Sequence, residues 1–340
     1  MVLAEDGPLA GALRAAGVEV HVRPLAVVRR ELVSVAGLSR LAAAWAADAG
    51  GLGRLARARG VALVHTNTSV TLGGAGAARI AGVPHVWHVR EVYAGFDRWW
   101  PAYRRLLTTA DALPCVSAAT AAQFAGAGEV IHDGLVGTVE RAPRAQARAV
   151  LGLPDDAFVA AVLGRLSSWK GQEVLVGAVA RLPGAVALIA GDAWRGDERR
   201  ARGLAERAAA LGAADRVRLL GFRDDVDVVL GASDVVAVPS TAPDPLPNSA
   251  LEAGAAGCCV VASAHGGLPE IVRDGETGVL VAPGDVGALA GALAALRDDP
   301  ERRERLGAAA RVDVRERFAP ERLLERVQAL YDRVLSSART

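Results

Sequence analysis

The chain has 340 residues, of which 51% are hydrophobic and 4% aromatic, with 39 Lys and Arg against 38 Asp and Glu. The length predicts roughly two domains of ordinary size, and the hydrophobic fraction is enough to fill two cores. A formal net charge of +1 excludes the strongly basic domain that a nucleic-acid-binding protein needs, so we expect no nucleic-acid partner.

The first half of the chain alternates predicted strands and helices. We expect strands at 19–22, 62–65, 85–89, 113–116 and 129–132, and helices at 37–59, 70–81, 100–109 and after 117. The alternation predicts a doubly wound, Rossmann-like domain over residues 1–140. Two glycine clusters, at 50–53 and 73–76, lack the G-x-G-x-x-G spacing of a dinucleotide site, and we interpret them as helix interruptions.

Polar side chains end two of these predicted strands, in the segments HTNT and WHVRE. Ligands of parallel α/β sheets bind beyond the carboxyl ends of the strands, so these segments predict a cleft. His88 is the candidate site residue, and the alternative is a core or surface histidine without such a role. We take Asn67, Arg90 and Glu91 as candidates for contact with an acceptor.

Residues 93–105 (YAGFDRWWPAYRR) are rich in aromatic side chains within an aromatic-poor chain, and arginines lie among them. This composition favours an interfacial surface or an acceptor pocket, which makes Trp99 and Trp100 further candidates on the acceptor side, and the alternative is packing in the domain core. At an interface, Trp99 and Trp100 would meet the lipid boundary while the neighbouring arginines met anionic head groups.

A polar, arginine-rich segment at 138–148 separates the two halves of the chain. After it we expect strands at 158–163, 186–190, 217–220, 234–238, 258–262 and 279–281, and helices from 171, at 197–211, at 248–256, around 270 and through the tail from 285. These elements predict a second Rossmann-like, parallel-sheet domain at 141–318. A terminal helix at 319–340 is expected to pack back toward the first domain.

Two cations lie on the loop between the first strand and the first helix of the second half. Arg165 directly follows Gly164, and Lys170 is the only lysine in the chain. A lone lysine among arginines suggests a site that needs a compact ammonium, such as a contact with a diphosphate. The alternative is a chance lysine.

The stretch from 235 to 283 has the order strand, loop, helix, strand of a complete ligand-binding unit. Asp244 and Glu252 can face one cleft and accept hydrogen bonds from the hydroxyls of a polyol. The alternative is that both are ordinary carboxylates favoured by a helix dipole. Asn248 and Ser249 are expected to cap the intervening helix. The remaining candidates lie in the turn and short helix that follow: Gly266, Gly267, Leu268 and Glu270.

Taken together, these motifs resemble glycosyltransferase family 4, retaining enzymes of the GT-B fold that use nucleotide-sugar donors. The resemblance runs from about residue 7 to the last helix and rests on GRLSSWKG, LLGFRDDVDVVLGASDVVAVPS, LEAGAAGCCVVAS and GGLPEIVRDGETGVLVAPGD. It implies an α/β fold of two Rossmann-like domains that face a cleft. It also implies transfer of a hexose-type sugar to a glycan, a lipid-linked or a small-molecule acceptor, without a metal or another cofactor.

The family's functional residues carry over by position. Arg165 and Lys170 would hold the donor diphosphate. Glu252 would bind the ribose, and Asp244 would bind the transferred sugar. The turn at 266–270 would lie against the sugar and phosphates, and Gly164, Asn248 and Ser249 would also contact the donor. The resemblance further implies retention of configuration, most simply by same-face attack in which the leaving phosphate helps to deprotonate the acceptor.

His88 matches the cleft histidine of the family's amino-terminal domain. Three departures stand beside these matches. The chain has Asp244 where the family usually has Glu, and Pro247 with Asn248 where the family has a Phe-Gly-type pair that offers backbone amides. The first strand, a glycine loop and the first helix, a unit of about 30 residues, are expected to be missing. An inactive, truncated GT-B protein and a sugar-nucleotide epimerase are therefore kept as alternatives.

The cysteines predict a reducing compartment. Cys115, Cys258 and Cys259 lie in apolar runs and are expected to be buried thiols. No apolar run reaches the roughly 20 residues of a membrane span, and acidic residues stand where a secretory signal would be basic. We expect a cytoplasmic protein with weak peripheral contact at the inner membrane surface.

Overall fold

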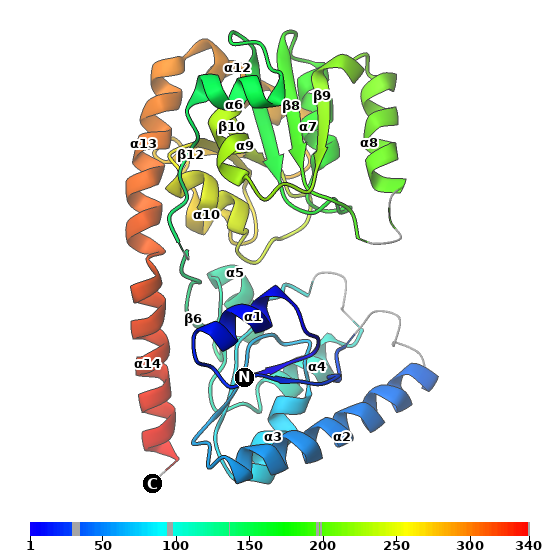
Figure 1. Ribbon diagram of the computed structural model, residues 1–340, viewed down its shortest axis with the longest axis vertical. Helices are drawn as coiled ribbons and strands as arrows, with labels where there is room; N and C mark the ends of the chain where they lie inside the picture. The colour runs from blue at the N-terminus through cyan, green and yellow to red at the C-terminus, as the bar shows by residue number, and fades with distance from the viewer. Residues whose placement is uncertain (29–34, 94–97, 136, 195–196, 198, 339–340) are drawn as a thin grey trace. The chain divides into compact units, whose positions relative to one another are not determined.

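The computed structural model describes residues 1–28, 35–93, 98–135, 137–194, 197 and 199–338 (Figure 1). The chain forms two compact units. The first unit comprises Met1–Val116, Ala121–Val130 and Val327–Thr340, and the second comprises Ser117–Thr120 and Ile131–Arg326. The boundary expected at residue 140 thus lies inside the second unit, and the terminal helix contributes residues to both.

The second unit is built on a six-stranded parallel sheet of order β12-β11-β10-β7-β8-β9. Its strands are β7 (Phe158–Leu163), β8 (Ala185–Ala190), β9 (Val217–Gly221), β10 (Val235–Val238), β11 (Cys259–Ser263) and β12 (Gly278–Val281). Every residue of β7, β8, β10 and β11 is buried. The sequence of a parallel strand that is covered on both faces is a continuous apolar run, and for this reason the bounds of these strands could be predicted closely from the sequence.

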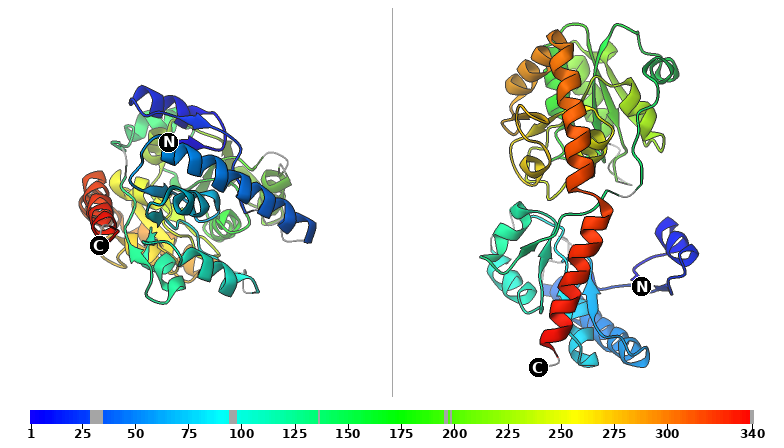
Figure 2. Two further views of the ribbon diagram at one scale, coloured as in Figure 1. Left: turned by 90° about the horizontal axis from the view of Figure 1, so that it is seen from below. Right: turned by 90° about the vertical axis from the view of Figure 1, so that its left-hand side faces the viewer.

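Helices cover both faces of this sheet (Figures 1 and 2). They are α6 (Arg144–Leu151), α7 (Gln172–Ala180), α8 (Arg199–Ala210), α9 (Val226–Ala232), α10 (Asn248–Ala255), α11 (Leu268–Ile271), α12 (Val286–Asp298) and α13 (Pro300–Arg317). On one face, the apolar sides of α7 and α12 share a core with the inward residues of β7, β10 and β11. Asp285 and Asp299 cap α12 and α13 by accepting hydrogen bonds from the amides of Ala288 and Arg302.

The last helix, α14 (Pro320–Ser337), begins in the second unit and ends in the first. Its hydrophobic residues follow the period of an amphipathic helix, and Leu330 and Val334 are buried. No helix in the described part of the chain is long and apolar enough to span a membrane.

The first unit contains shorter parallel strands than the sequence predicts. Its strands are β1 (Val2–Leu3), β2 (His21–Val22), β3 (Val64–Thr66), β4 (His85–Trp87), β5 (Pro114–Cys115) and β6 (Glu129–Val130), paired as β1-β2, β3-β4 and β5-β6. Its helices are α1 (Pro8–Ala15), α2 (Val35–Ala58), α3 (Gly73–Ala81), α4 (Trp100–Leu107) and α5 (Ala118–Ala121), the last of which starts in the second unit. Bridges of Val86 with Ala112 and of Val89 with Cys115 join β4 to the β5 segment. The pairing therefore continues past the short strands.

The glycine clusters are not helix interruptions, and that interpretation is wrong. The cluster at 50–53 lies inside α2, and the cluster at 73–76 forms the first turn of α3. A Cβ on Gly53 would lie 2.6 Å from Cγ2 of Ile80, and one on Gly76 would lie 2.4 Å from Cβ of Ala49. The glycines thus allow α2 and α3 to pack side by side (Figure 2).

The three cysteines are buried and free, as expected from the apolar runs around them. Burial raises the pKa of Cys115 to about 12 and that of Cys258 to about 11. Thiols held protonated in this way act as small apolar side chains of the two cores.

Candidate functional site

Glycines shape the β7 loop, residues 164–171, at the carboxyl end of the sheet. Gly164 has φ +133° and Gly171 has φ +73°. A Cβ on Gly171 would lie 1.8 Å from the carbonyl oxygen of Pro239, which follows β10, and a Cβ on Gly191, which follows β8, would lie 2.2 Å from that of Gly164. These close approaches bring the ends of three neighbouring strands together where ligands of such sheets bind.

Lys170 and Asp244, which come from two of these strand ends, form an ion pair. Lys170 Nζ lies 2.7 Å from Asp244 Oδ2 and 4.5 Å from the centroid of the Trp169 ring. The Asp244 side chain is 6% exposed and that of Lys170 is 21% exposed. The structure therefore brings Lys170, expected on the diphosphate, next to Asp244, expected on the sugar. The charges of the two side chains neutralise each other.

Arg165 is exposed on the same loop and stacks on an aromatic ring. Its guanidinium carbon lies 3.9 Å from the centroid of Trp194, which follows β8. The Arg165 carbonyl accepts a hydrogen bond of 3.0 Å from Nε2 of Gln172 at the start of α7. The sequence analysis missed Trp194, although its place just after a buried strand was a usable signal.

The glycine turn after β11 packs against the backbone around Asp244. A Cβ on Gly266 (φ +62°) would lie 2.4 Å from the Asp244 carbonyl oxygen, and one on Gly267 would lie 2.0 Å from that of Pro245. The Gly267 amide donates a hydrogen bond of 2.8 Å to the Asp244 carbonyl. The turn therefore belongs to the same site, but the Leu268 side chain is fully buried and leaves only its backbone for a ligand.

Asn248 and Ser249 do not cap α10, contrary to expectation. The helix begins at Asn248 with Pro247 in the cap position, and no side chain accepts a capping hydrogen bond. Pro247 has an extended backbone (φ −72°, ψ 118°), so Asn248 and Ser249 are already residues of the first helical turn and cannot act as the cap. Asn248 is exposed and Ser249 half-buried at this helix start.

Glu252 is a half-buried carboxylate in α10, and burial raises its pKa. Within the described residues, no hydrogen bond or ion pair of its side chain is seen. A carboxylate without protein donors can accept hydrogen bonds from the hydroxyls of a ligand. This arrangement suits the ribose contact that the family resemblance implies.

The Glu270 carboxylate is held by three protein groups. Its carboxylate accepts hydrogen bonds from the amides of Ala118 (2.9 Å) and Ala119 (3.2 Å) at the start of α5, and it lies 2.8 Å from Nε2 of His132. Burial raises the pKa of Glu270, but the hydrogen bonds from His132 and the two amides lower the pKa by more than burial raises it. The net shift of the Glu270 pKa is downward. We leave Glu270 out of the proposed donor set.

In the first unit, His88 is buried at 3% exposure, and its Nε2 atom has no hydrogen-bond partner among the described residues. The His65 ring lies 5.6 Å away, and its Nδ1 atom lies 2.5 Å from the hydroxyl of Tyr331 in α14. Burial, followed by the charges of Arg90 and His65, lowers the pKa of His88 to about 3. His88 is therefore neutral near pH 7.

Of the five residues expected on the acceptor side of the first unit, Glu91 is held by hydrogen bonds from neighbouring residues. Its carboxylate accepts hydrogen bonds from the amides of Ser69 (3.1 Å) and Arg90 (3.0 Å) and from the hydroxyls of Thr68 and Ser69. These contacts fix the turn after β3, and the acceptor role of Glu91 stays a prediction. Asn67 is exposed at this turn and Arg90 is half-buried.

The two tryptophans next to α4 have different environments. Trp100 stacks on Tyr93 at a centroid distance of 4.9 Å, contacts Phe124 edge-on, and packs against the core. Trp99 is 41% exposed, and Arg98 lies 5.7 Å from its ring centroid. Core packing is therefore correct for Trp100, while Trp99 faces solvent. Residues 94–97 of the aromatic segment lie outside the described residues.

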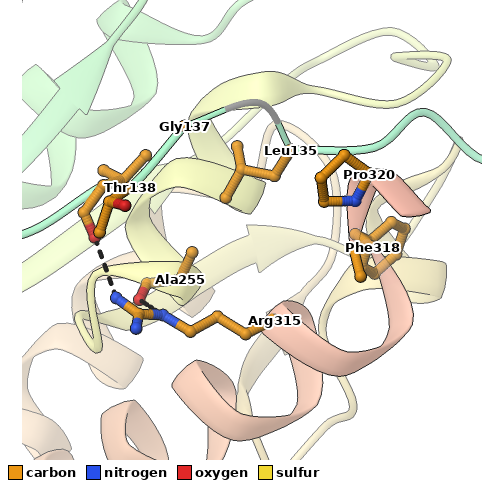
Figure 3. Close-up of a pocket in the computed structure, with 9 residues that line it drawn as sticks. Leu135, Gly137, Thr138, Ala255, Arg315, Phe318 and Pro320 are labelled. Carbon is orange, nitrogen blue, oxygen red and sulfur yellow. Dashed lines mark hydrogen bonds between the residues drawn. The ribbon is translucent and has the colours of Figure 1, made fainter. Parts of the chain in front are cut away.

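A small pocket in the second unit is lined by none of the candidate residues (Figure 3). Leu135, Phe318 and Pro320 line it, and Arg315 donates a hydrogen bond of 2.9 Å to the Ala255 carbonyl at its edge. Next to it, the Leu135 amide donates a bond of 2.8 Å to the Phe318 carbonyl. These contacts fasten the segment after β6 to the end of α13, which is a structural role.

We expect the first unit to lose stability as the pH falls from about 6.5 to 4.5. Burial lowers the pKa of His85 to about 4 and that of His88 to about 3, so below pH 6.5 the unfolded chain binds protons that the folded unit excludes. In this window each histidine should lower the free energy of unfolding by about 1.4 kcal/mol for every pH unit.

Urea unfolding at pH 7, 6 and 5 measures this dependence. His88→Gln should reduce the slope of stability against pH by about 1.4 kcal/mol per unit, whereas His21→Gln, at a more exposed histidine, serves as the control. Equal slopes for the wild-type chain and His88→Gln would contradict the assignment of a neutral buried His88.

Two family models match the chain. Residues 143–313 match the family described as glycosyl transferases group 1, and residues 8–135 match glycosyltransferase family 4. The first of these ranges contains every candidate donor residue.

Curated relatives match part of the chain. The D-inositol 3-phosphate glycosyltransferase of Mycobacterium ulcerans is 40% identical over 168 residues, which cover 48% of this chain and 36% of that protein. The protein of the same name from Mycolicibacterium paratuberculosis is 41% identical over 175 residues, or 51% of this chain and 40% of the relative. The matches span well under half of these relatives.

Solved structures match nearly the whole chain. The Anabaena protein HepE in complex with UDP and glucose is 26% identical with a TM-score of 0.84, covering 97% of this chain and 90% of that one. The sucrose-phosphate synthase of Thermosynechococcus elongatus is 26% identical with a TM-score of 0.78, covering 97% and 92%.

Proposed function

Because the chain belongs to the group 1 glycosyltransferases and has their GT-B class of fold, we propose that it moves a sugar from a nucleoside diphosphate to an acceptor hydroxyl with retention. One observation carries the proposal. Arg165 and Lys170 lie on the loop after β7 and Asp244 lies on the loop after β10, and these loops pack closely at the carboxyl edge of one parallel sheet. Two cations and a carboxylate so placed can bind a diphosphate and the hydroxyls of a sugar.

The chemistry assigned to these residues is electrostatic. Breaking the anomeric bond leaves negative charge on the departing diphosphate, and preorganised cations stabilise that charge. We assign this role to Arg165 and Lys170. The leaving phosphate then helps to remove the acceptor proton on the same face, so that the configuration is retained, and no metal is required in this proposal.

The proposed donor is a nucleotide diphosphate sugar, with Glu252 on the ribose and Asp244 on the sugar. The similarity to HepE, whose structure holds UDP and glucose, makes UDP-sugars the first class to test. We assign to His88, which is neutral and buried, the role of the family's cleft histidine as a hydrogen-bonding group. The acceptor is proposed as a glycan, a lipid-linked or a small-molecule hydroxyl.

The test is turnover of UDP-glucose, and then of other nucleoside diphosphate sugars, by the full chain. Release of nucleoside diphosphate that depends on an added acceptor, with a glycosylated product, is the expected result. Formation of a new sugar epimer without acceptor would favour the epimerase alternative. Binding of nucleotide sugars without any turnover would favour the non-catalytic one.

We expect Asp244→Asn to reduce the discrimination between donor sugars more than it reduces the affinity for UDP. The amide keeps the shape of the carboxylate but accepts hydrogen bonds more weakly and no longer pairs with Lys170. Calorimetric titration with UDP and competition between UDP-sugars measure the two effects. A large loss of affinity for UDP alone would mean that Asp244 and Glu252 have exchanged roles.

We further propose weak membrane contact through the outer face of α4, where Trp99, Leu106 and three arginines are exposed. Each surface arginine near an anionic bilayer contributes about 1 kcal/mol, so three give salt-sensitive attachment. The chain should sediment with anionic vesicles at low salt and leave them at high salt, and Trp99→Ala should weaken sedimentation at low salt. Arg305→Gln on α13 is the control, and attachment that ignores salt would contradict this proposal.

A further inference from the structure

The Arg165–Trp194 stack is a feature that the proposed reaction does not require. Trp194 is 64% exposed, so packing in the core does not explain a tryptophan at this position. The guanidinium of Arg165 lies over its ring at 3.9 Å, within the range of a cation–π contact.

The backbone holds the two residues in register. The amide of Gly164 donates to the carbonyl of Ala190 at 2.9 Å, and that of Leu166 donates to the carbonyl of Asp192 at 3.0 Å. These bonds extend the β7-β8 pairing beyond both strands and fix Arg165 beside the segment that carries Trp194. The stack therefore follows from the architecture of the sheet edge.

The two cations of the β7 loop differ in what holds them. Lys170 is paired with Asp244, so its charge is neutralised. Arg165 has no carboxylate within ion-pairing distance in the described part of the chain, and its guanidinium carbon lies over the Trp194 ring. A guanidinium that stacks on a ring keeps its in-plane N–H donors available, and these are the groups that bind a diphosphate.

We propose that Trp194 is a positioning residue that holds Arg165 ready for the donor diphosphate. This inference rests on the proposed function, because it assigns Arg165 to the diphosphate. An Arg165 side chain that is stacked before the donor arrives loses less conformational freedom on binding. The ring thereby strengthens donor binding without touching the donor.

The experiment is a double-mutant cycle on UDP affinity, measured by calorimetry with the full chain. We expect Trp194→Leu to weaken UDP binding about fivefold, as loss of an exposed cation–π contact implies, and Trp194→Phe to stay within about twofold of wild type. On the Arg165→Met background, Trp194→Leu should have no further effect. Trp45→Leu, which removes a partly exposed tryptophan from the first unit, is the control.

Two results would overturn the inference alone. The first is an unchanged UDP affinity of Trp194→Leu, and the second is an equal loss with and without Arg165, which would mean that the ring contacts the nucleotide itself. Failure of the wild-type chain to bind UDP, ADP or GDP would instead count against the proposed function, and the role of Trp194 would fall with it. In the free protein, Arg165→Met should also shift the tryptophan emission, and this shift should vanish in Trp194→Phe.

Discussion

Lys170→Ala should lower turnover by about 10²- to 10³-fold in a chain that still folds. This is the range for loss of one preorganised donor to the charge that develops in a transition state. Lys170 is the only lysine in this chain. Its ammonium group lies at the carboxyl edge of the sheet, where the donor is proposed to bind. Initial rates with saturating donor and acceptor measure the effect.

The pairing with Asp244 determines the controls for this experiment. Removing the ammonium leaves a carboxylate that is only 6% exposed without its partner, which can destabilise the fold independently of catalysis. Lys170→Met combined with Asp244→Asn removes both charges and separates the two effects, and thermal melts show whether each variant is folded. Lys170→Arg tests the need for a compact ammonium. Wild-type turnover in a folded Lys170→Ala chain would refute the assignment.

The second unit could be predicted closely from the sequence because its strands are buried on both faces. Runs such as 158–163 and 235–238 are continuously apolar, and glycine or proline follows each of them. In the first unit the strands are only two or three residues long and several are half-buried. Apolar runs there extend beyond the paired residues, so the predicted strands were too long.

The candidate site could be predicted as a set of loops but not as a set of contacts. The order of strands and helices places Arg165, Lys170 and Asp244 at one sheet edge. The ion pair between the last two joins residues that are 74 positions apart, and no local pattern encodes it. The contacts of Glu270 could not be predicted for the same reason, since its partners come from distant segments at 118–119 and at His132.

Small residues were the other source of error. A run of glycines predicts an interruption of a helix when only the local sequence is considered, because glycine has a low helix propensity. In α2 and α3 the same glycines are required by the neighbouring helix, as Ala49 opposite Gly76 shows. Helix–helix distance is a tertiary property that a sequence window does not contain.

We expect Asp234→Ala to lower the free energy of unfolding of the second unit by about 3 to 5 kcal/mol, the scale of breaking a buried ion pair. The Asp234 side chain is 2% exposed and that of Arg148 is fully buried. One carboxylate oxygen accepts hydrogen bonds from Arg148 at 2.9 Å and from the Val159 amide at 2.8 Å, and the other accepts one from Arg144 at 2.5 Å. Arg303 lies 3.6 Å from the same carboxylate.

This carboxylate joins α6 and α13 to the sheet, so its loss leaves a buried guanidinium without its counter-charge. Because the two units need not unfold together, amide hydrogen exchange in β7 and β10 is the appropriate measurement. Glu316→Ala, which breaks the exposed pair with Arg322, should change stability by less than about 0.5 kcal/mol. Arg148→Met combined with Asp234→Ala should cost less than the sum of the single changes, because neither charge is then left unpaired. Additive losses would show that the two side chains stabilise the unit through separate contacts.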